Sequence, residues 1–194
     1  MQLDETDRGF SYSHDAPLDM RMDSTQVITA YEIVNHYEPG ALVKILRTFG
    51  EEKFATRIVE NIVKARALAP LNSTMQLATL VKESIPAATR RTGGNPAKRT
   101  FQALRIAVND ELGAITRAIP QALDVVEVGG RVVVMSFQSL EDKIVKEFFV
   151  EASTSKSPRD LPVELPEFAA KFSLVIQASE KASQAEQDEN SRST

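Results

Sequence analysis

Apolar residues in the first half of the chain recur at the three- and four-residue spacing of amphipathic helices. The first apolar stripe stops at Gly50, a residue that commonly follows a helix end. The second apolar stripe follows Glu51 and Glu52 in the sequence and stops before Pro70. The helix dipole favours negative charges in a first helical turn, so the two glutamates are expected to begin this helix. We therefore predict an all-helical unit over about residues 24–87, with apolar faces made of Leu42, Ile45, Leu46 and Phe49, of Phe54, Ile58, Ile62 and Val63, and of Leu77, Leu80 and Val81.

The strongest periodic signal lies in the second half of the chain. Apolar residues trace one helical face from Phe101 to Ile119, and Pro120 is expected to end or kink this helix before a shorter one resumes. The apolar run 131–137 is rich in β-branched residues and predicts a strand covered on both faces, as in a parallel α/β sheet. A helix that Ser139 can cap follows this run. Residues 171–177 predict another strand.

The first 23 residues are typical of a loop, because their apolar residues follow neither helical nor strand spacing and glycine and proline interrupt them. This loop carries too many large apolar side chains for a disordered tail. We expect it to pack against the rest of the protein through Phe10, Tyr12, Leu18, Met20 and Met22.

Composition excludes several kinds of site. The 194 residues include no cysteine, so disulfides and thiolate metal sites are excluded, and His14 and His36 are too few for a histidine metal cluster. The longest apolar run is far shorter than the roughly 18 residues of a membrane span, and the acidic start does not resemble an export signal. We therefore expect a cytoplasmic protein without a metal site and without membrane contact.

Charge is distributed unevenly along the chain. The formal net charge is −4, yet the window from Lys82 to Arg105 holds six basic residues against one acid. Such a local basic patch can neutralise the phosphates of a nucleic acid while the remaining acidic surface keeps the chain in solution. The alternative is a solvated loop and helix face without a partner.

None of the short glycine-rich nucleotide motifs, zinc motifs or nucleophile elbows occurs in the sequence. Ser136, Gln138 and Ser139 nevertheless follow the predicted strand 131–137, at the edge where open α/β sheets bind ligands. A capped helix whose hydroxyl groups are satisfied internally is the alternative interpretation of these residues.

Four segments carry a more specific signal, and they cover most of residues 2–150: RGFSYSHDAPLDMRMD (8–23), GEEKFATRIVENIVKAR (50–66), RTFQALRIAVNDELGAI (99–115) and GGRVVVMSFQSLEDKIVKEFF (129–149). In this order they resemble signature blocks of the bacterial ribosomal RNA small-subunit methyltransferase H family, also called MraW. Asn95 and Gln138 depart from the pattern, because the family more often has histidine at these positions.

The resemblance implies an S-adenosylmethionine-dependent enzyme that methylates the exocyclic amine of a cytosine in small-subunit (16S) ribosomal RNA, an rRNA (cytosine-N4)-methyltransferase. It also implies an α/β fold, an incomplete Rossmann-like methyltransferase core with an inserted all-helical domain. On this basis we expect residues 1–23 to form a loop of the core, 24–90 the helical insertion, 91–177 the C-terminal half of the core, and 178–194 a polar tail.

The resemblance further implies site residues. Gln2 matches a family position that contacts S-adenosylmethionine, whereas the glycine-rich donor loop and the catalytic residues are expected upstream of Met1. The donor site is therefore expected to be incomplete and this chain inactive alone. Basic residues are expected to contact RNA phosphates and two polar residues to form hydrogen bonds near the cleft, namely Arg90, Arg91, Lys98, Arg99 and Arg105 with Asn109 and Gln138. For Asn109 a polar helix face is the alternative.

An RNA-binding or protein-interaction module without catalysis is the alternative function. RNA binding without binding of the methyl donor would favour this alternative, and the partner expected for the chain is small-subunit ribosomal RNA or the 30S subunit. A core sheet without its leading strands would leave Val132 to Met135 and the helix from Phe101 to Ile119 partly uncovered, so we also predict self-association.

Overall fold

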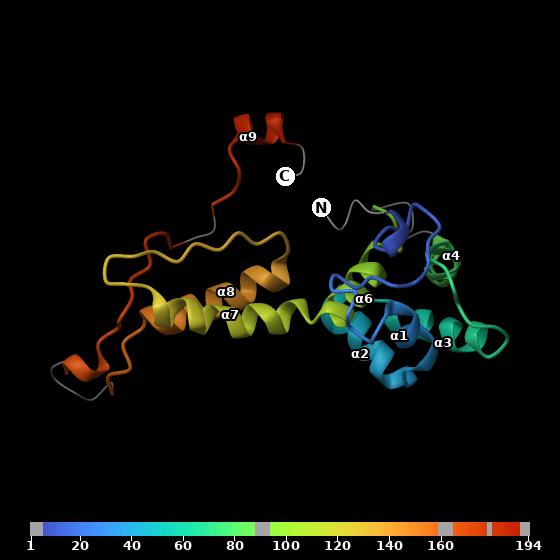
Figure 1. Ribbon diagram of the computed structural model, residues 1–194, viewed down its shortest axis with the longest axis horizontal. Coiled ribbons are helices and arrows are strands. Elements are labelled where there is room, and N and C mark those ends of the chain that lie inside the picture. Colours follow the sequence, from blue (N-terminus) through green and yellow to red (C-terminus); the bar gives the residue numbers. More distant parts are fainter. Residues whose placement is uncertain (1–5, 88–93, 159–164, 178–179, 191–194) are drawn as a thin grey trace. The chain divides into compact units, whose positions relative to one another are not determined.

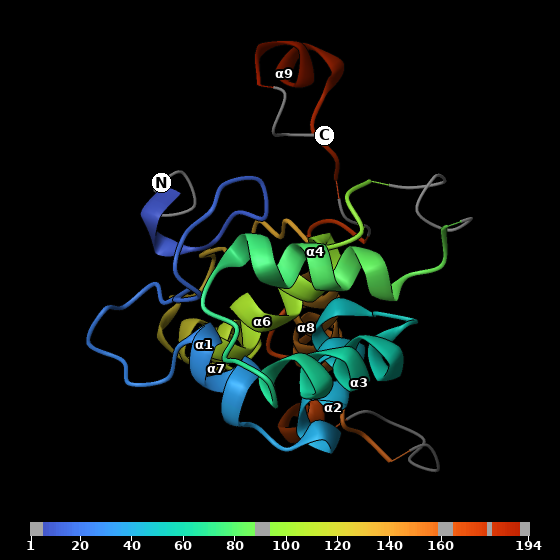
Figure 2. The ribbon, with the colours of Figure 1, turned by 90° about the vertical axis from the view of Figure 1, so that its right-hand side faces the viewer.

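The computed structural model describes residues 6–87, 94–158, 165–177 and 180–190. The chain divides into two compact units, Met1–Ala114 and Ile115–Thr194. In the first unit (Figures 1 and 2) a short 3₁₀ helix is followed by five described α-helices: η2 (Thr6–Arg8), α1 (Ala30–His36), α2 (Pro39–Gly50), α3 (Ala55–Arg66), α4 (Thr74–Ser84) and α6 (Lys98–Asn109). The remaining described elements are α7 (Glu111–Val125), α8 (Ser139–Ser153), η3 (Pro166–Phe168) and α9 (Gln184–Glu189).

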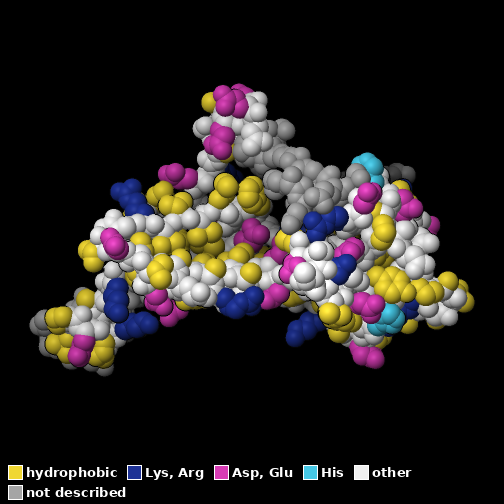
Figure 3. All heavy atoms as spheres, in the orientation of Figure 1, with side chains coloured by type: hydrophobic (Ala, Val, Ile, Leu, Met, Phe, Trp, Pro, Cys, Tyr) yellow, Lys and Arg dark blue, Asp and Glu magenta, His cyan; other side chains and the backbone are white. Residues whose placement is uncertain are grey.

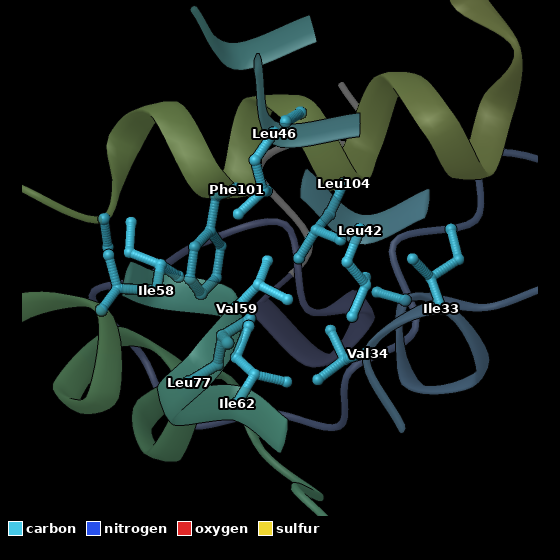
Figure 4. Packing of buried hydrophobic residues seen from close by; sticks show 14 of the residues in the cluster. Ile33, Val34, Leu42, Leu46, Ile58, Val59, Ile62, Leu77, Phe101 and Leu104 are labelled. Atoms are coloured by element: carbon cyan, nitrogen blue, oxygen red, sulfur yellow. The ribbon is translucent and has the colours of Figure 1, made fainter. Parts of the chain in front are cut away.

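The first unit has a continuous apolar core, and the helices predicted from the apolar stripes are present. Phe101 and Leu104 of α6 point toward side chains of α2 and α3 (Figure 4), and α4 closes the cluster with Leu77. Ser73 starts α4 with a full capping box, since its side chain accepts from Gln76 N–H and the Gln76 side chain accepts from the Ser73 N–H. The fully buried members of the core include Ile33, Val34, Leu42, Leu46, Ile58, Ile62, Leu77 and Leu104.

Helices α2 and α6 lie against each other more closely than side chains normally permit. A Cβ atom built on Gly50, the last residue of α2, would lie 2.5 Å from the carbonyl oxygen of Arg99. Gly50 is therefore required for the close approach of two backbones. The Gln102 side chain strengthens this contact, because its Nε2 donates to the Phe49 carbonyl oxygen at 3.1 Å.

The predicted start of the next helix is wrong. Glu51 adopts the left-handed conformation with φ of 48° and caps the C-terminus of α2. Glu52 is buried, and its carboxylate accepts a hydrogen bond from the Phe54 N–H at 2.9 Å. Helix α3 begins only at Ala55, so both glutamates build the turn between two helices instead of a first helical turn.

The single helix predicted from Phe101 to Ile119 is also wrong. Helix α6 ends at Asn109, Asp110 takes a left-handed φ of 48°, and α7 begins at Glu111. Of the two outcomes expected at Pro120, a helix end or a kink, the end does not occur, because α7 continues through this proline to Val125. A proline inside a helix removes one hydrogen bond, and the turns on either side of it keep theirs.

Strands are absent at both predicted positions within the described residues. Residues 131–137 and 171–177 form no ladder, and the one backbone bridge of the described chain joins Pro17 to Ser73. A strand exists only by pairing with a neighbour, and Val133 and Met135 are 87% and 77% exposed instead of covered. Apolar side chains accordingly gather on the surface of the second unit, Ile115–Thr194 (Figure 3). The described fold is helical, and the predicted α/β core is not seen.

The start of α8 differs from its prediction in one detail. Ser139 is the first helical residue, Gln138 occupies the cap position, and no side chain of that position caps the helix. The Glu141 carboxylate instead accepts a hydrogen bond from the Phe137 N–H at 2.9 Å. No described helix is long and apolar enough to cross a membrane. The predicted division into four parts, 1–23, 24–90, 91–177 and 178–194, stays a prediction.

Candidate functional site

The opening loop packs onto the first unit, as predicted from its large apolar side chains. Leu18 and Met20 are fully buried in the core. The backbone of Leu18 donates to the Asn72 carbonyl at 3.3 Å, and its own carbonyl accepts from the Tyr31 N–H at 2.6 Å. The opening loop is therefore part of the folded first unit and contributes side chains to its core.

A glycine fixes the path of this loop. Gly9 has a φ of +73°, and a Cβ atom there would overlap the carbonyl oxygen of Pro17. Both the left-handed backbone and the close approach require the absence of a side chain.

Gly9→Ala is expected to lower the free energy of unfolding of the first unit by about 1–3 kcal/mol, because it combines backbone strain with overlap. Urea denaturation followed by circular dichroism measures the loss. The matched control is Gly40→Ala, since Gly40 has open space around its Cβ position in α2. An equal loss in both variants would contradict the role of Gly9.

A network of hydrogen bonds centred on the Arg21 guanidinium lies at the C-terminal end of the opening loop. The Asp19 carboxylate accepts from Arg21 Nε at 2.6 Å and from a second guanidinium nitrogen at 2.8 Å. The same guanidinium donates to the carbonyl oxygens of Ser24 and Gln26 at 3.0 and 2.6 Å. The hydrogen-bonded Arg21 lowers the pKa of the Asp19 carboxyl, and the hydrogen bond from the Thr25 hydroxyl lowers that of Asp23.

Because the folded pKa of Asp19 lies below its ordinary value of 3.8, the charged form stabilises the folded state above that pH. This contribution is expected to disappear as the pH falls from 3.8 through the folded pKa. Urea midpoints measured across this range should fall less steeply for Asp19→Asn than for the parent chain. Arg21→Gln should flatten the dependence in the same way, and an unchanged slope in both variants would contradict the assignment.

Asn109 joins this loop to the end of α6. Its Nδ2 donates to the carbonyl oxygens of Met20 and Arg105 at 2.7 and 2.8 Å, and its Oδ1 accepts from the Met22 N–H at 2.6 Å. Met20 has a φ of +61°, a strained value for a residue with a side chain. Asn109 thus binds the carbonyl of the strained, buried Met20 and the N–H of Met22, two residues further along the loop.

The predicted basic residues fall into different surroundings. The Arg105 guanidinium makes a two-pronged ion pair with Glu111 at 2.9 and 3.0 Å. Arg99 donates to the Glu51 carbonyl oxygen at 2.8 Å, and Lys98 is exposed at the start of α6. Gln2, Arg90 and Arg91 lie outside the described residues.

Gln138 belongs to the second unit. Its Nε2 donates to Glu141 Oε1 at 3.0 Å, while its buried Oε1 has no hydrogen-bond partner in the described part of the chain. An amide oxygen in this state is suited to accept a hydrogen bond from a ligand. Within the described ranges no group of acidic or histidine side chains is arranged to hold a metal ion.

Sequence reasoning missed the network around Arg21. The segment DMRMD alternates charged residues with methionine in a loop, and this alternation was the available signal. Each unit also has an open hollow. A hollow of about 340 Å³ borders Asp19, Thr29 and Tyr31 in the first unit, and a hollow of about 490 Å³ in the second unit is lined by parts of α7 and α8, with Leu123 and Phe148, and by residues 167–172.

The chain belongs to the MraW methylase family, whose profile matches residues 1–194. The family resemblance predicted from the sequence is thereby confirmed. Among its relatives is the ribosomal RNA small subunit methyltransferase H of Rhodococcus jostii (strain RHA1), 57% identical over 193 residues that make up 100% of this chain and 57% of the relative. The enzyme of the same name from Mycobacterium marinum (strain ATCC BAA-535 / M) is 55% identical over 100% of this chain and 49% of the relative. The chain thus spans about half the length of the curated relatives it matches.

Proposed function

We propose that this chain is the RNA-handling part of an S-adenosylmethionine-dependent rRNA (cytosine-N4)-methyltransferase that acts on 16S ribosomal RNA in the small (30S) subunit. The observation that carries this proposal is the 57% identity over the whole chain to a relative named ribosomal RNA small subunit methyltransferase H. The family's description as methylases supports the methyl donor, and the relatives' names support the RNA.

Methyl transfer to an amine depends mainly on orientation, because the nitrogen lone pair must align with the donor methyl group. We propose that Gln2 contacts S-adenosylmethionine, and that the rest of the donor site belongs to the half of the relatives that this chain does not match. The isolated chain is then inactive. The contribution of its own residues is to hold the RNA beside that site.

For the RNA itself, we propose that Arg90, Arg91, Lys98 and Arg99 contact phosphates. Arg105 and Asn109 act as positioning residues, because the first is engaged by Glu111 and the second by the backbone of the opening loop. Gln138 accepts a hydrogen bond from the RNA through its Oε1, which has no partner in the described chain. A binding module without catalysis is the alternative, supported by the helical unit having a core of its own.

A segment exchange tests the proposed function. This chain replaces the matching segment of the Rhodococcus jostii relative, and the hybrid is incubated with labelled S-adenosylmethionine and small subunits that lack the modification. We expect label at a cytosine amine of the 16S RNA. A hybrid that binds the donor but transfers no label would overturn the catalytic proposal and favour the binding module.

Calorimetry on the isolated chain tests the incomplete donor site. We expect no heat of S-adenosylmethionine binding at micromolar concentrations of the donor. Micromolar affinity would show that the 194 residues hold a complete donor site by themselves.

A further inference from the structure

Five basic residues of the first unit belong to α2, to the turn that follows it, and to the helices α3 and α6 that pack against α2. Arg47 belongs to the last turn of α2, Lys53 to the following turn, Arg57 to α3, and Lys98 and Arg99 to the first turn of α6. All five side chains are exposed. We call these five residues the α2–α6 basic surface.

Two hydrogen bonds hold this surface together. One guanidinium nitrogen of Arg99 donates to the Glu51 carbonyl oxygen at 2.8 Å, and Gly50 brings the backbones of α2 and α6 into contact beside it. One guanidinium nitrogen of Arg47 donates to Thr56 Oγ1 at 2.9 Å, one residue before Arg57. The fold therefore joins residues that lie far apart in the sequence and fixes two of the arginines in place.

The surface keeps unused donors. Arg47 and Arg99 each use one nitrogen of a guanidinium that carries five N–H groups. The side chains of Lys53, Arg57 and Lys98 form no hydrogen bond or ion pair with any described residue, and the one bond of Lys98 outside the helix ladder is its backbone N–H to the Asn95 carbonyl oxygen. The acidic residues of the same elements are Glu51, Glu52 and Glu60, and Glu52 is buried with its carboxylate on the Phe54 N–H. The local charge is positive on a chain whose net charge is −4.

We propose that the α2–α6 basic surface binds the phosphate backbone of RNA, with Arg47, Lys53 and Arg57 as contacts in addition to Lys98 and Arg99. This inference rests on the proposed function for the identity of the polyanion. Guanidinium groups that are already held by the protein lose less conformational freedom on binding and match phosphate oxygens with two parallel hydrogen bonds. Helix α6 also begins at this surface without a side-chain cap, so its dipole adds to the attraction for anions.

Salt-dependent binding of the full chain to RNA tests this surface. The probe is a fluorescein-labelled single-stranded RNA of about 20 nucleotides, and the dissociation constant is measured by anisotropy between about 50 and 300 mM KCl. Lys53→Gln/Arg57→Gln is expected to weaken binding about 10- to 30-fold at about 0.1 M salt and to reduce the logarithmic salt slope by about 1.4. Glutamine keeps the helix propensity of both positions.

The matched control is Lys143→Gln/Lys146→Gln, which removes two charges from exposed positions of α8. It should leave the salt slope within about 0.3 of the parent value, since the inference assigns these lysines no phosphate contact and a charge without such a contact releases no counterion. Equal losses in both double variants, or no RNA binding by the parent chain, would overturn the inference. Displacement of the RNA by polyglutamate at equal charge concentration would also overturn it, because the surface would then be one for acidic polypeptides. Thermal melting verifies that each variant is folded.

The hybrid enzyme separates this inference from the proposed function. If Lys53→Gln/Arg57→Gln leaves the KM of the hybrid for small subunits unchanged, the surface is not an RNA contact although the methyltransferase assignment stands. If the unaltered hybrid fails to methylate while the isolated chain binds RNA with the expected salt slope, the surface stands and the catalytic proposal fails.

Discussion

Asn109→Ala is expected to lower the free energy of unfolding of the first unit by about 2–4 kcal/mol. The substitution removes three hydrogen bonds and leaves the carbonyl oxygen of Met20 and the N–H of Met22 without this partner. It also releases Met20 from a strained left-handed conformation that the surrounding structure has to maintain. Urea denaturation of the full chain, followed by circular dichroism, measures the loss.

The matched control is Asn72→Ala. The Asn72 side chain is exposed, and its main chain keeps the bond from the Leu18 N–H to the Asn72 carbonyl. We expect a change within about 0.5 kcal/mol for this variant. A loss smaller than about 1 kcal/mol for Asn109→Ala would mean that the buried side chains of Leu18 and Met20 hold the loop without the amide.

The helices of the first unit were predictable because their signals are local. A spacing of four residues places two side chains on the same side of a helix, whatever surrounds that helix. Leu42 and Leu46 of α2 have this spacing, and so do Ile58 and Ile62 of α3. The structure buries all four. The packed opening loop was predictable for a similar reason, since its large apolar side chains need cover wherever the chain goes.

The interruption at Asp110 was not predictable from periodicity. Val108 and Leu112 keep the helical spacing across it, yet the helix stops where Asn109 turns its amide toward the backbone of Met20 and Met22. This contact joins residues more than eighty positions apart. A sequence pattern carries no record of such a partner, and tertiary contacts therefore decided the boundary.

The candidate site was predictable only where basic residues cluster in the sequence. Lys98 and Arg99 stand out in a basic window of the sequence. Arg47 of α2 and Arg57 of α3 lie outside this window, and they come near it only through the packing of α2 against α6 and of α3 against α2. Arg105 shows the opposite case. It belongs to the basic window, but Glu111 neutralises it after the chain turns at Asp110.

The strand prediction for residues 131–137 failed because a strand depends on a partner. The β-branched composition of this run is genuine, and its side chains remain apolar and exposed in the second unit. The backbone of residues 132–136 makes no hydrogen bond to any described residue. An extended apolar segment with free backbone groups is a template for pairing with another chain. Self-association of this chain follows as an expectation.

We expect the purified chain to show a mass above that of a monomer in size-exclusion chromatography with light scattering, rising with protein concentration. Val133→Lys/Met135→Lys should shift it toward the monomer, because lysine on both exposed positions repels a pairing copy and opposes burial. The matched control is Val27→Lys/Leu68→Lys, which replaces residues that are 83% and 91% exposed in the first unit. If the control dissociates the chain equally, general surface hydrophobicity causes the association. A parent chain that is monomeric at all concentrations would contradict pairing through this segment.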